Sequence, residues 1–301
     1  ALLQGNSGEK RFLPFFYMID DIAKWDDIEE LEKANPNLGV SVTKDYLLEE
    51  IEVAKGSASR QSEFICKYAC LKQNSSLAWL PAEVVENVCG EEIRLEDFKG
   101  CYCVAGIDLS QTTDLTAACV VIEKDGKLNV ISHFWLPSAK IDEAVQRDGL
   151  PYYNYIDRGF MSPSGDNFVD YHDCYNWMVN LVQEYECLPL KVGYDRYSAQ
   201  YLIQDLDAFG FHTDDVFQGD NLWPIMQELE GVMKDGGINF GDNQIMKAHL
   251  LNAAVKMNVE RGRGRLVKLS PNAHLDGVAA LLDALTVRAK YYSEINEQLK
   301  N

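Results

Sequence analysis

Several common sequence features are missing from this chain. No apolar run approaches the roughly 18 residues that a membrane-spanning helix needs, and the N-terminal residues lack the charged-then-apolar order of a secretory signal. The eight cysteines include no Cys-x-x-Cys pair and the histidines show no complementary spacing, which excludes a zinc ribbon. We therefore expect no membrane partner, and free thiols in a reducing compartment.

Positive charge is also scarce. The formal net charge is −19, which argues against a general nucleic-acid binder. Residues 244–268 are the exception, because six basic side chains stand there against a single acid, Glu260: Lys247, Lys256, Arg261, Arg263, Arg265 and Lys268. A basic stripe on an acidic body can guide a polyanion, although a solvated loop explains the stripe equally well.

The length of 301 residues and the hydrophobic content of 47% allow one large or two modest domains. Residues 1–98 are acidic and helix-rich, with helices predicted over about 45–55, capped by Thr43, and over about 60–71. Residues 99–301 form the second predicted domain. Because the chain starts at Ala1 rather than Met, we expect a fragment of a longer protein.

The second part begins with β-type runs at 102–108, 115–123 and 128–136. Asp125-Gly126 between the last two is a strong hairpin signal, so the three runs predict an antiparallel meander. Residues 137–170 are predicted to be irregular, since Pro and Gly recur in them. A helix over 171–186 and a strand over 190–194, which ends on Asp195, follow.

The rest of the chain alternates helix and strand. We predict helices from about Ser198 and over 221–235, 244–260 and 273–291, with short strands at 215–218 and 266–269. The Arg-Gly-Arg-Gly-Arg stretch at 261–265 is predicted to be a loop. A meander followed by such alternation indicates an α/β fold with a mixed central sheet flanked by helices.

Two aspartates end apolar strands. Asp108 closes Val-Ala-Gly-Ile-Asp, and Asp195 closes Val-Gly-Tyr-Asp. The carboxyl edge of an α/β sheet is where such folds bind ligands, and two carboxylates on adjacent strands repel each other unless a cation joins them. The alternative is that each aspartate caps the next helix or pairs with an arginine.

A third acid, Asp276, lies in the first turn of the last predicted helix, where the helix dipole favours a carboxylate. Asp283 follows two turns later on the same face and is the reserve for Asp276. Simple decoration of the helix N-terminus is the alternative for Asp276. Three carboxylates on two strands and a helix suit two Mg²⁺ or Mn²⁺ ions roughly 4 Å apart, the arrangement used for phosphodiester hydrolysis.

Four motifs in order carry a resemblance to a known family. They are Gly106-Ile-Asp-Leu-Ser, Thr113-Asp-Leu-Thr-Ala, Gly193-Tyr-Asp-Arg-Tyr and His274-Leu-Asp-Gly-Val-Ala-Ala-Leu. With Ala34-Asn-Pro-Asn-Leu-Gly upstream, the chain resembles the nuclease half of a tailed-bacteriophage terminase large subunit, which has a ribonuclease H-like fold. The likeness covers nearly the whole chain.

The resemblance implies an endonuclease that cuts double-stranded viral DNA concatemers during genome packaging, in the cytoplasm of the bacterial host. It implies that Asp108, Asp195 and Asp276 are catalytic metal ligands, with His274 nearby and Asp114 of undefined role. The small terminase subunit and the portal protein become partners through the full-length parent. We expect the phosphate contacts to come from Arg196, Arg261, Arg263, Arg265 and Lys268.

One departure from the family is that the phosphate-binding Gly-x-x-x-x-Gly-Lys-[Ser/Thr] loop of its ATPase motor is missing, so residues 1–98 are interpreted as a linker to an absent motor. Other interpretations are open. Gly-Ile-Asp-Leu-Ser-Gln-Thr-Thr resembles the first phosphate loop of actin-like and sugar-kinase ATPases, but a second loop is lacking. A junction resolvase or transposase shares the chemistry, and a non-catalytic docking module of a packaging motor would use the acids as caps.

Overall fold

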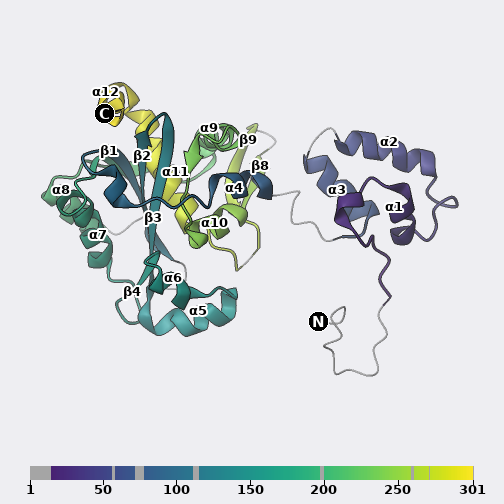
Figure 1. Cartoon of the computed structure of the whole chain (residues 1–301), viewed down its shortest axis with the longest axis horizontal. Helices are drawn as coiled ribbons and strands as arrows, with labels where there is room; N and C mark the ends of the chain where they lie inside the picture. The colour runs from purple at the N-terminus through teal and green to yellow at the C-terminus, as the bar shows by residue number, and fades with distance from the viewer. Residues whose placement is uncertain are drawn as a thin grey trace. The chain divides into compact units, whose positions relative to one another are not determined.

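The computed structural model describes residues 15–55, 58–71, 78–110, 115–196, 200–258, 261–270 and 272–300. The chain divides into two compact units, Ala1–Leu77 and Ala78–Asn301, which are described separately (Figure 1). The boundary predicted between residues 98 and 99 falls inside the second unit, because helix α4 (Ala82–Val88) buries Val85 and Val88 in the core of that unit. None of the described helices has the length and apolar character needed to cross a membrane.

The first unit is helical, as predicted. Its elements are η1 (Ile22–Lys24), α1 (Ile28–Ala34), α2 (Lys44–Lys55) and α3 (Ala58–Tyr68). The predicted cap of α2 is confirmed, since the Tyr46 backbone N–H donates to Thr43 Oγ1 at 3.2 Å. Leu31, Leu47 and Phe64, one from each α-helix, meet in a core of their own.

A seven-stranded mixed sheet forms the centre of the second unit. Its strands are β1 (Tyr102–Asp108), β2 (Thr116–Lys124), β3 (Lys127–Pro137), β4 (Met161–Ser164), β5 (Leu188–Asp195), β6 (Thr213–Val216) and β7 (Ile238–Asn239). The spatial order is β4-β3-β2-β1-β5-β6, with β7 beside the start of β3. The predicted antiparallel meander β1-β2-β3 is confirmed, and β5 and β6 extend it parallel to β1.

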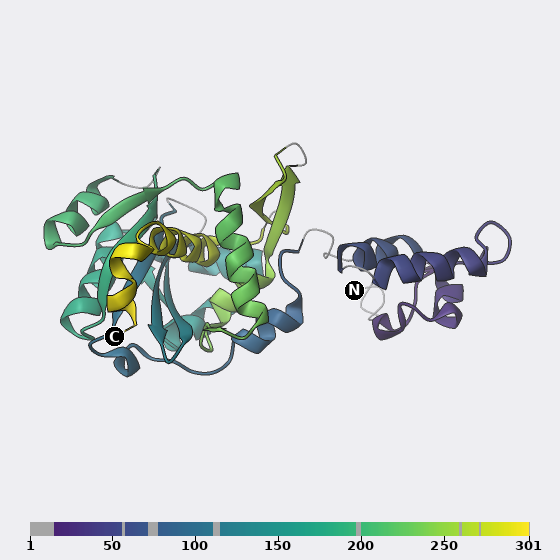
Figure 2. The ribbon, with the colours of Figure 1, turned by 90° about the horizontal axis from the view of Figure 1, so that it is seen from above.

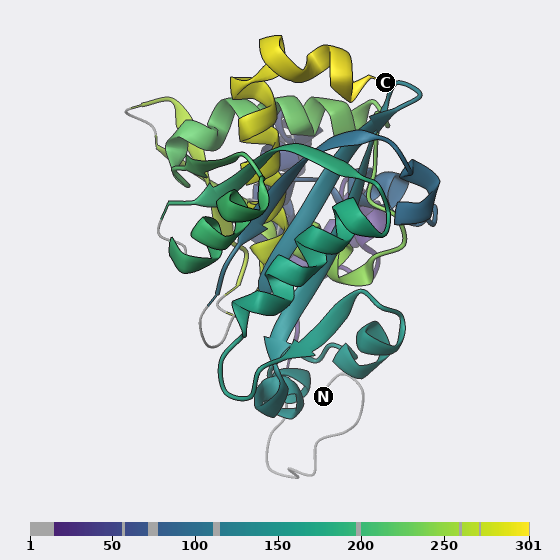
Figure 3. The ribbon, with the colours of Figure 1, turned by 90° about the vertical axis from the view of Figure 1, so that its left-hand side faces the viewer.

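Helices cover both faces of this sheet. The remaining elements are η2 (Leu95–Phe98), η3 (Ser138–Lys140), α5 (Ile141–Asp148), α6 (Tyr152–Asp157), α7 (Tyr171–Gln183), α8 (Gln200–Phe209), η4 (Asp220–Leu222), α9 (Trp223–Lys234), α10 (Gln244–Leu251), α11 (Asp276–Lys290) and α12 (Tyr292–Leu299), and a separate hairpin of β8 (Ala253–Asn258) and β9 (Arg263–Lys268). In Figure 3 the teal α7 crosses the front of the sheet, and Figure 2 shows the yellow α11 laid across its other face.

Side chains of β1 alternate between the two resulting cores, as the pleat of a strand requires. Cys103, Ala105 and Ile107 pack in the core shared with α7 and α8, whereas Val104 packs in the core shared with α11. This burial on both faces explains why the sequence of β1 is a nearly continuous apolar run.

Two glycines allow α11 to lie directly on the strands that carry the predicted acids. A Cβ at Gly106 of β1 would lie 1.9 Å from the carbonyl oxygen of Ala280, and one at Gly193 of β5 would lie 2.3 Å from that of Asp283. Both positions therefore exclude every larger residue. The close approach fixes the height of α11 above the ends of β1 and β5.

The prediction for residues 137–170 is wrong, since they contain η3, α5, α6 and β4. Some of the Gly and Pro residues in this segment flank short helices, whereas Pro163 lies within β4 and Gly165 follows that strand. Gly149 ends α5 in the left-handed conformation, with φ of +67°, and Pro151 precedes α6. Both roles are common for these residue types.

The helix predicted over 244–260 is also wrong in its second half, where α10 ends at Leu251 and β8 begins. The Arg-Gly-Arg-Gly-Arg stretch belongs to the β8–β9 hairpin rather than to a loop. Gly264 packs against Trp223, because a Cβ there would lie 2.6 Å from that ring. Since side chains alternate along a strand, Arg263 and Arg265 face the other way and are exposed.

Candidate metal and nucleic-acid site

Two of the predicted acids end neighbouring strands. β1 and β5 run parallel with Ile107 opposite Tyr194, so Asp108 and Asp195 follow side by side at the carboxyl edge of the sheet. Each aspartate is partly buried. The predicted adjacency of the two strands is therefore confirmed, and it concentrates negative charge at one point of the edge.

Asp276 begins α11 and is 7% exposed. Its Oδ2 atom is buried, and no hydrogen-bond donor in the described part of the chain reaches it. The Nδ1 atom of His274 lies 3.6 Å from that oxygen, longer than a hydrogen bond. A buried carboxylate oxygen without a donor is costly unless a cation or water satisfies it.

Asp283 lies two turns further along α11 and is fully buried. Gln218 Nε2 donates to Oδ2 at 2.9 Å, while Oδ1 has no hydrogen-bond donor among the described residues. Burial raises the pKa of Asp283 well above its ordinary value, and the charges of Asp108 and Asp195 raise it further. The helix thus adds a carboxyl group whose pKa is raised by the charges of both strand-end acids.

A cavity of about 420 Å³ opens beside these acids. Asp108 and Asp276 line it together, as do Gln218 and the basic residues Arg265 and Lys268 of β9. Apolar side chains of α11, among them Ala279 and Leu282, form another part of its wall. Acids and bases therefore border one concave surface, as a site for a metal-bound phosphate requires.

The donor set fits a hard divalent cation, which prefers carboxylate oxygens. Two buried oxygens, Asp276 Oδ2 and Asp283 Oδ1, lack donors within the described ranges. Burial is the main cause of the raised pKa of Asp283, and the charges of Asp108 and Asp195 add to it. As the described side chains stand, no group of three or more His, Cys, Asp or Glu converges closely enough to hold an ion.

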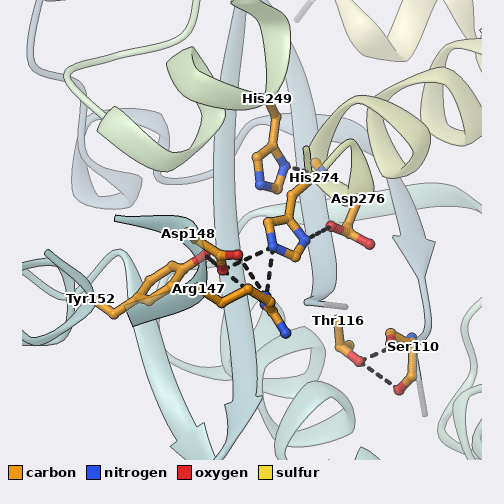
Figure 4. A network of polar contacts seen from close by, with 9 residues as sticks. Ser110, Thr116, Arg147, Asp148, Tyr152, His249, His274 and Asp276 are labelled. Carbon is orange, nitrogen blue, oxygen red and sulfur yellow. Dashed lines mark hydrogen bonds and ion pairs between the residues drawn. The ribbon is translucent and has the colours of Figure 1, made fainter. Parts of the chain in front are cut away.

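A polar network lies on the other side of Asp276 (Figure 4). Asp148, at the end of α5, accepts hydrogen bonds from Arg147 Nε at 2.6 Å and Nη2 at 2.8 Å, and from the Tyr152 hydroxyl at 2.9 Å. His274 Nε2 lies 3.0 Å from Asp148 Oδ2. Figure 4 shows the His274 ring between Asp148 and Asp276.

The network keeps Asp148 charged. Burial raises the pKa of this carboxyl group, but the hydrogen bonds from Arg147, Tyr152 and His274 outweigh burial and lower the pKa below its ordinary value. The sequence did not single out Asp148, Arg147 or Tyr152, because all three fall in the segment predicted to be irregular, whereas His274 was expected near the metal. The sequence does contain one signal of a helix end in this segment, because Gly149 follows Asp148 and Pro151 comes two residues later.

The predicted phosphate-binding residues divide into two groups. Arg265 and Lys268 border the cavity, and Arg263 is exposed on the same hairpin. Arg196 instead pairs with Asp215 at 2.6 Å, and Arg261 pairs with Asp220 at 3.0 Å. Asp114 lies outside the described residues.

A second cavity, of about 470 Å³, lies between β3 and α7 and is lined by His133, Trp177 and Phe240 among others. None of the predicted site residues borders it. The smaller cavity is the better candidate for the predicted chemistry, because it alone of the two contains the strand-end acid Asp108.

A mixed sheet with an antiparallel meander, acids ending β1 and β5, and an acidic helix laid across them define the ribonuclease H-like class. The family model described as "Terminase large subunit, endonuclease domain" matches residues 7–291. The chain belongs to this family, and the resemblance drawn from its sequence is confirmed.

The chain is similar over most of its length to several longer proteins. Protein YmfN of Escherichia coli (strain K12) is 25% identical over 306 residues, covering 97% of this chain and 66% of that protein. The large terminase subunit of Enterobacteria phage HK97 is 25% identical over 255 residues, covering 82% and 49%. The crystal structure of the HK97 large terminase superposes with a TM-score of 0.62 at 23% identity, over 90% of this chain and 56% of that one. The chain thus spans about half to two thirds of the length of these relatives.

Proposed function

We propose that this chain is a metal-dependent endonuclease that cleaves double-stranded viral DNA concatemers during genome packaging. The observation that carries the proposal is the meeting of Asp108, Asp195 and α11 at one sheet edge, beside a cavity with basic residues on its rim. Membership of the terminase endonuclease family supports the same activity.

Asp108, Asp195 and Asp276 would hold two Mg²⁺ or Mn²⁺ ions through carboxylate oxygens. When bound, such ions activate a water molecule and stabilise the charge that develops on the phosphate and on the leaving oxygen. Asp283 lies behind the ligands and fixes Gln218 through the bond to its amide. The apolar wall of α11 limits the water that reaches the reacting phosphate.

Arg265 and Lys268 would bind the DNA backbone next to the acids, because both border the cavity that contains Asp108. Arg263 extends this basic edge along the hairpin. Arg196 and Arg261 would contribute only after exchanging their acidic partners, Asp215 and Asp220, for phosphate. These contacts are not sequence-specific, since phosphates position a protein on DNA without selecting bases.

Packaging would involve the full-length parent protein in the cytoplasm of the bacterial host, with the small terminase subunit and the portal protein as partners. We propose that the acidic helical unit joins the nuclease to a motor domain in that parent. This role rests on the family and on the share of its relatives that the chain spans.

The test is cleavage of supercoiled plasmid by the purified chain with Mn²⁺, Mg²⁺ or a chelator. Asp108→Asn and Asp195→Asn should abolish metal-dependent nicking, because each removes a charged ligand. Asp235→Asn, an exposed acid after α9, is the matched control and should cut normally. Folded wild-type protein that cuts with neither metal would favour the docking module, and activity that survives both substitutions would place the site elsewhere.

A further inference from the structure

The α5–α6 segment joins β3 to β4 and directs two polar side chains to one place. Asp148 is the last residue of α5 and Tyr152 the first of α6, and the left-handed Gly149 turns the chain between them. Their side chains meet beside residue 274, 126 positions away from Asp148 in the sequence. The segment therefore reaches the beginning of α11 rather than ending in solvent.

Asp148 is held more firmly than a surface acid. Its side chain is 2% exposed, and it accepts two bonds from Arg147 and one from the Tyr152 hydroxyl. A buried charge with this many hydrogen bonds has one orientation, because any rotation would leave a buried group without its partner. The carboxylate is thus a fixed point for the His274 ring.

The His274 ring is fixed from several sides. Nε2 lies 3.0 Å from Asp148 Oδ2, and the side chain is only 5% exposed. The His249 ring stacks on it, with centroids 6.1 Å apart and 28° between the planes. His249 Nδ1 in turn accepts the backbone N–H of Gly277, the residue after Asp276.

This geometry turns the other ring nitrogen toward the proposed metal ligand. His274 Nδ1 faces Asp276 Oδ2 at 3.6 Å, the buried oxygen that no donor in the described ranges reaches. The imidazole therefore lies against this side of the Asp276 carboxylate. Carboxylates that bind a metal are themselves held by outer-shell groups, and such groups tune the affinity of the site.

We propose that Asp148 is a positioning residue for the metal site, acting through His274 to hold Asp276 in the orientation that binds the ion. The proposal rests on the proposed function. It assigns a role to the α5–α6 segment, which otherwise only covers the end of the sheet. Loss of such an outer-shell partner weakens metal binding by about 10- to 100-fold.

The experiment measures Mn²⁺ affinity of the full chain without DNA, by titration calorimetry, and the melting temperature with and without Mn²⁺. Asp148→Asn and His274→Gln should each weaken Mn²⁺ binding by about 10- to 100-fold and reduce the Mn²⁺-induced rise in melting temperature. The double variant should bind no more weakly than the worse single variant, since both changes break one chain of contacts.

Asp142→Asn is the matched control. Asp142 lies on the same helix and accepts a bond from the Tyr153 hydroxyl at 2.7 Å, but it is exposed and remote from His274. Its substitution should leave Mn²⁺ affinity unchanged. Tyr152→Phe, which deletes one donor to Asp148 and keeps the ring, provides a milder variant with a smaller loss of affinity if Asp148→Asn does not fold.

A folded Asp148→Asn variant with wild-type affinity would overturn the inference, as would unchanged affinity in both Tyr152→Phe and His274→Gln. A lower metal-free melting temperature with an unchanged Mn²⁺-induced rise would show a merely structural role and would also overturn it. A wild-type chain that binds no Mn²⁺ would overturn the proposed function itself, so the two failures are distinguishable.

Discussion

Asp276 and Asp283 share one face of α11 but differ in surroundings. Asp276 borders the cavity with Asp108, whereas Asp283 is fully buried and bonded to Gln218. Asp276→Asn should therefore lower Mn²⁺ affinity by at least about 100-fold, and Asp283→Asn by only about 10-fold, the lower end of the range for an outer-shell group. Titration calorimetry of the two variants checks this, and the opposite order would make Asp283 the third ligand.

His133 provides a pH prediction away from the site. Burial lowers the pKa of His133 to about 4, although a hydrogen bond with the Gly159 backbone partly opposes the effect. Because the folded pKa lies below the unfolded value of 6.5, the neutral ring contributes stability that is complete above pH 6.5 and is lost as the pH falls toward 4. A shift of this size corresponds to at most about 3 kcal/mol.

His133→Gln should flatten the dependence of unfolding free energy on pH over this window, because glutamine keeps a polar group near Ser162 but does not titrate. Urea unfolding at several pH values measures the effect. His212→Gln, at an exposed position, is the control. An unchanged slope in His133→Gln would mean that other groups carry the acid sensitivity.

At the scale of elements, the contact between α11 and the sheet depends on glycine. Gly106→Ala would place a Cβ against backbone of α11, which cannot rotate away as a side chain can. We expect a loss of about 3 kcal/mol or more in the free energy of unfolding, and weaker metal binding because α11 carries Asp276.

Thermal and urea unfolding measure this loss. Gly231→Ala on α9 is a matched control, since a Cβ there has nothing within 4 Å and alanine favours a helix over glycine by about 1 kcal/mol. That control should be stabilised. If Gly106→Ala and Gly231→Ala had the same free energy of unfolding, α11 would be able to move away from β1 without loss of stability.

The β8–β9 hairpin predicts a graded effect on DNA binding. The double variant Arg265→Ala/Lys268→Ala should bind DNA more weakly. The plot of log affinity against log salt concentration should become less steep by about 2, because two phosphate contacts are lost. Arg261→Ala should change binding less, since Arg261 already pairs with Asp220. Fluorescence anisotropy at several salt concentrations measures the DNA affinity of both variants, with Lys99→Ala as an exposed control. An equal loss of affinity in the double variant and in Arg261→Ala would contradict this prediction.

Local sequence signals predicted the elements that hold Asp108 and Asp195, because β1 and β5 are apolar runs and Asp125-Gly126 forces a hairpin. Local signals failed where tertiary contacts determine the secondary structure. Residues 253–258 have good helix formers but pair with β9, and α5 and α6 are too short for a periodic pattern. The Asp148–His274 contact joins distant segments, so no local pattern predicts it. That the predicted acids bind metal, and that the basic residues bind DNA, are still predictions.

At the scale of the whole molecule, every proposed site residue lies in the second unit, and each unit has its own apolar core. Residues 78–301 expressed alone should therefore fold and retain Mn²⁺ affinity within about threefold of the whole chain, since binding depends on local ligands. Circular dichroism and titration calorimetry check this. A truncated chain that is folded but does not bind Mn²⁺ would show that the first unit contributes to the site.

The proposed site is built from β1, the α5–α6 segment, β5 and α11, which begins only at Asp276. During synthesis on the ribosome these parts appear in that order, and the last proposed ligand, Asp276, emerges 168 residues after the first, Asp108. A nascent chain therefore has the basic and acidic residues of the strands but not a complete metal centre. Under the proposed function, a nascent chain in which α11 has not yet been made would lack a proposed ligand and would not cleave DNA.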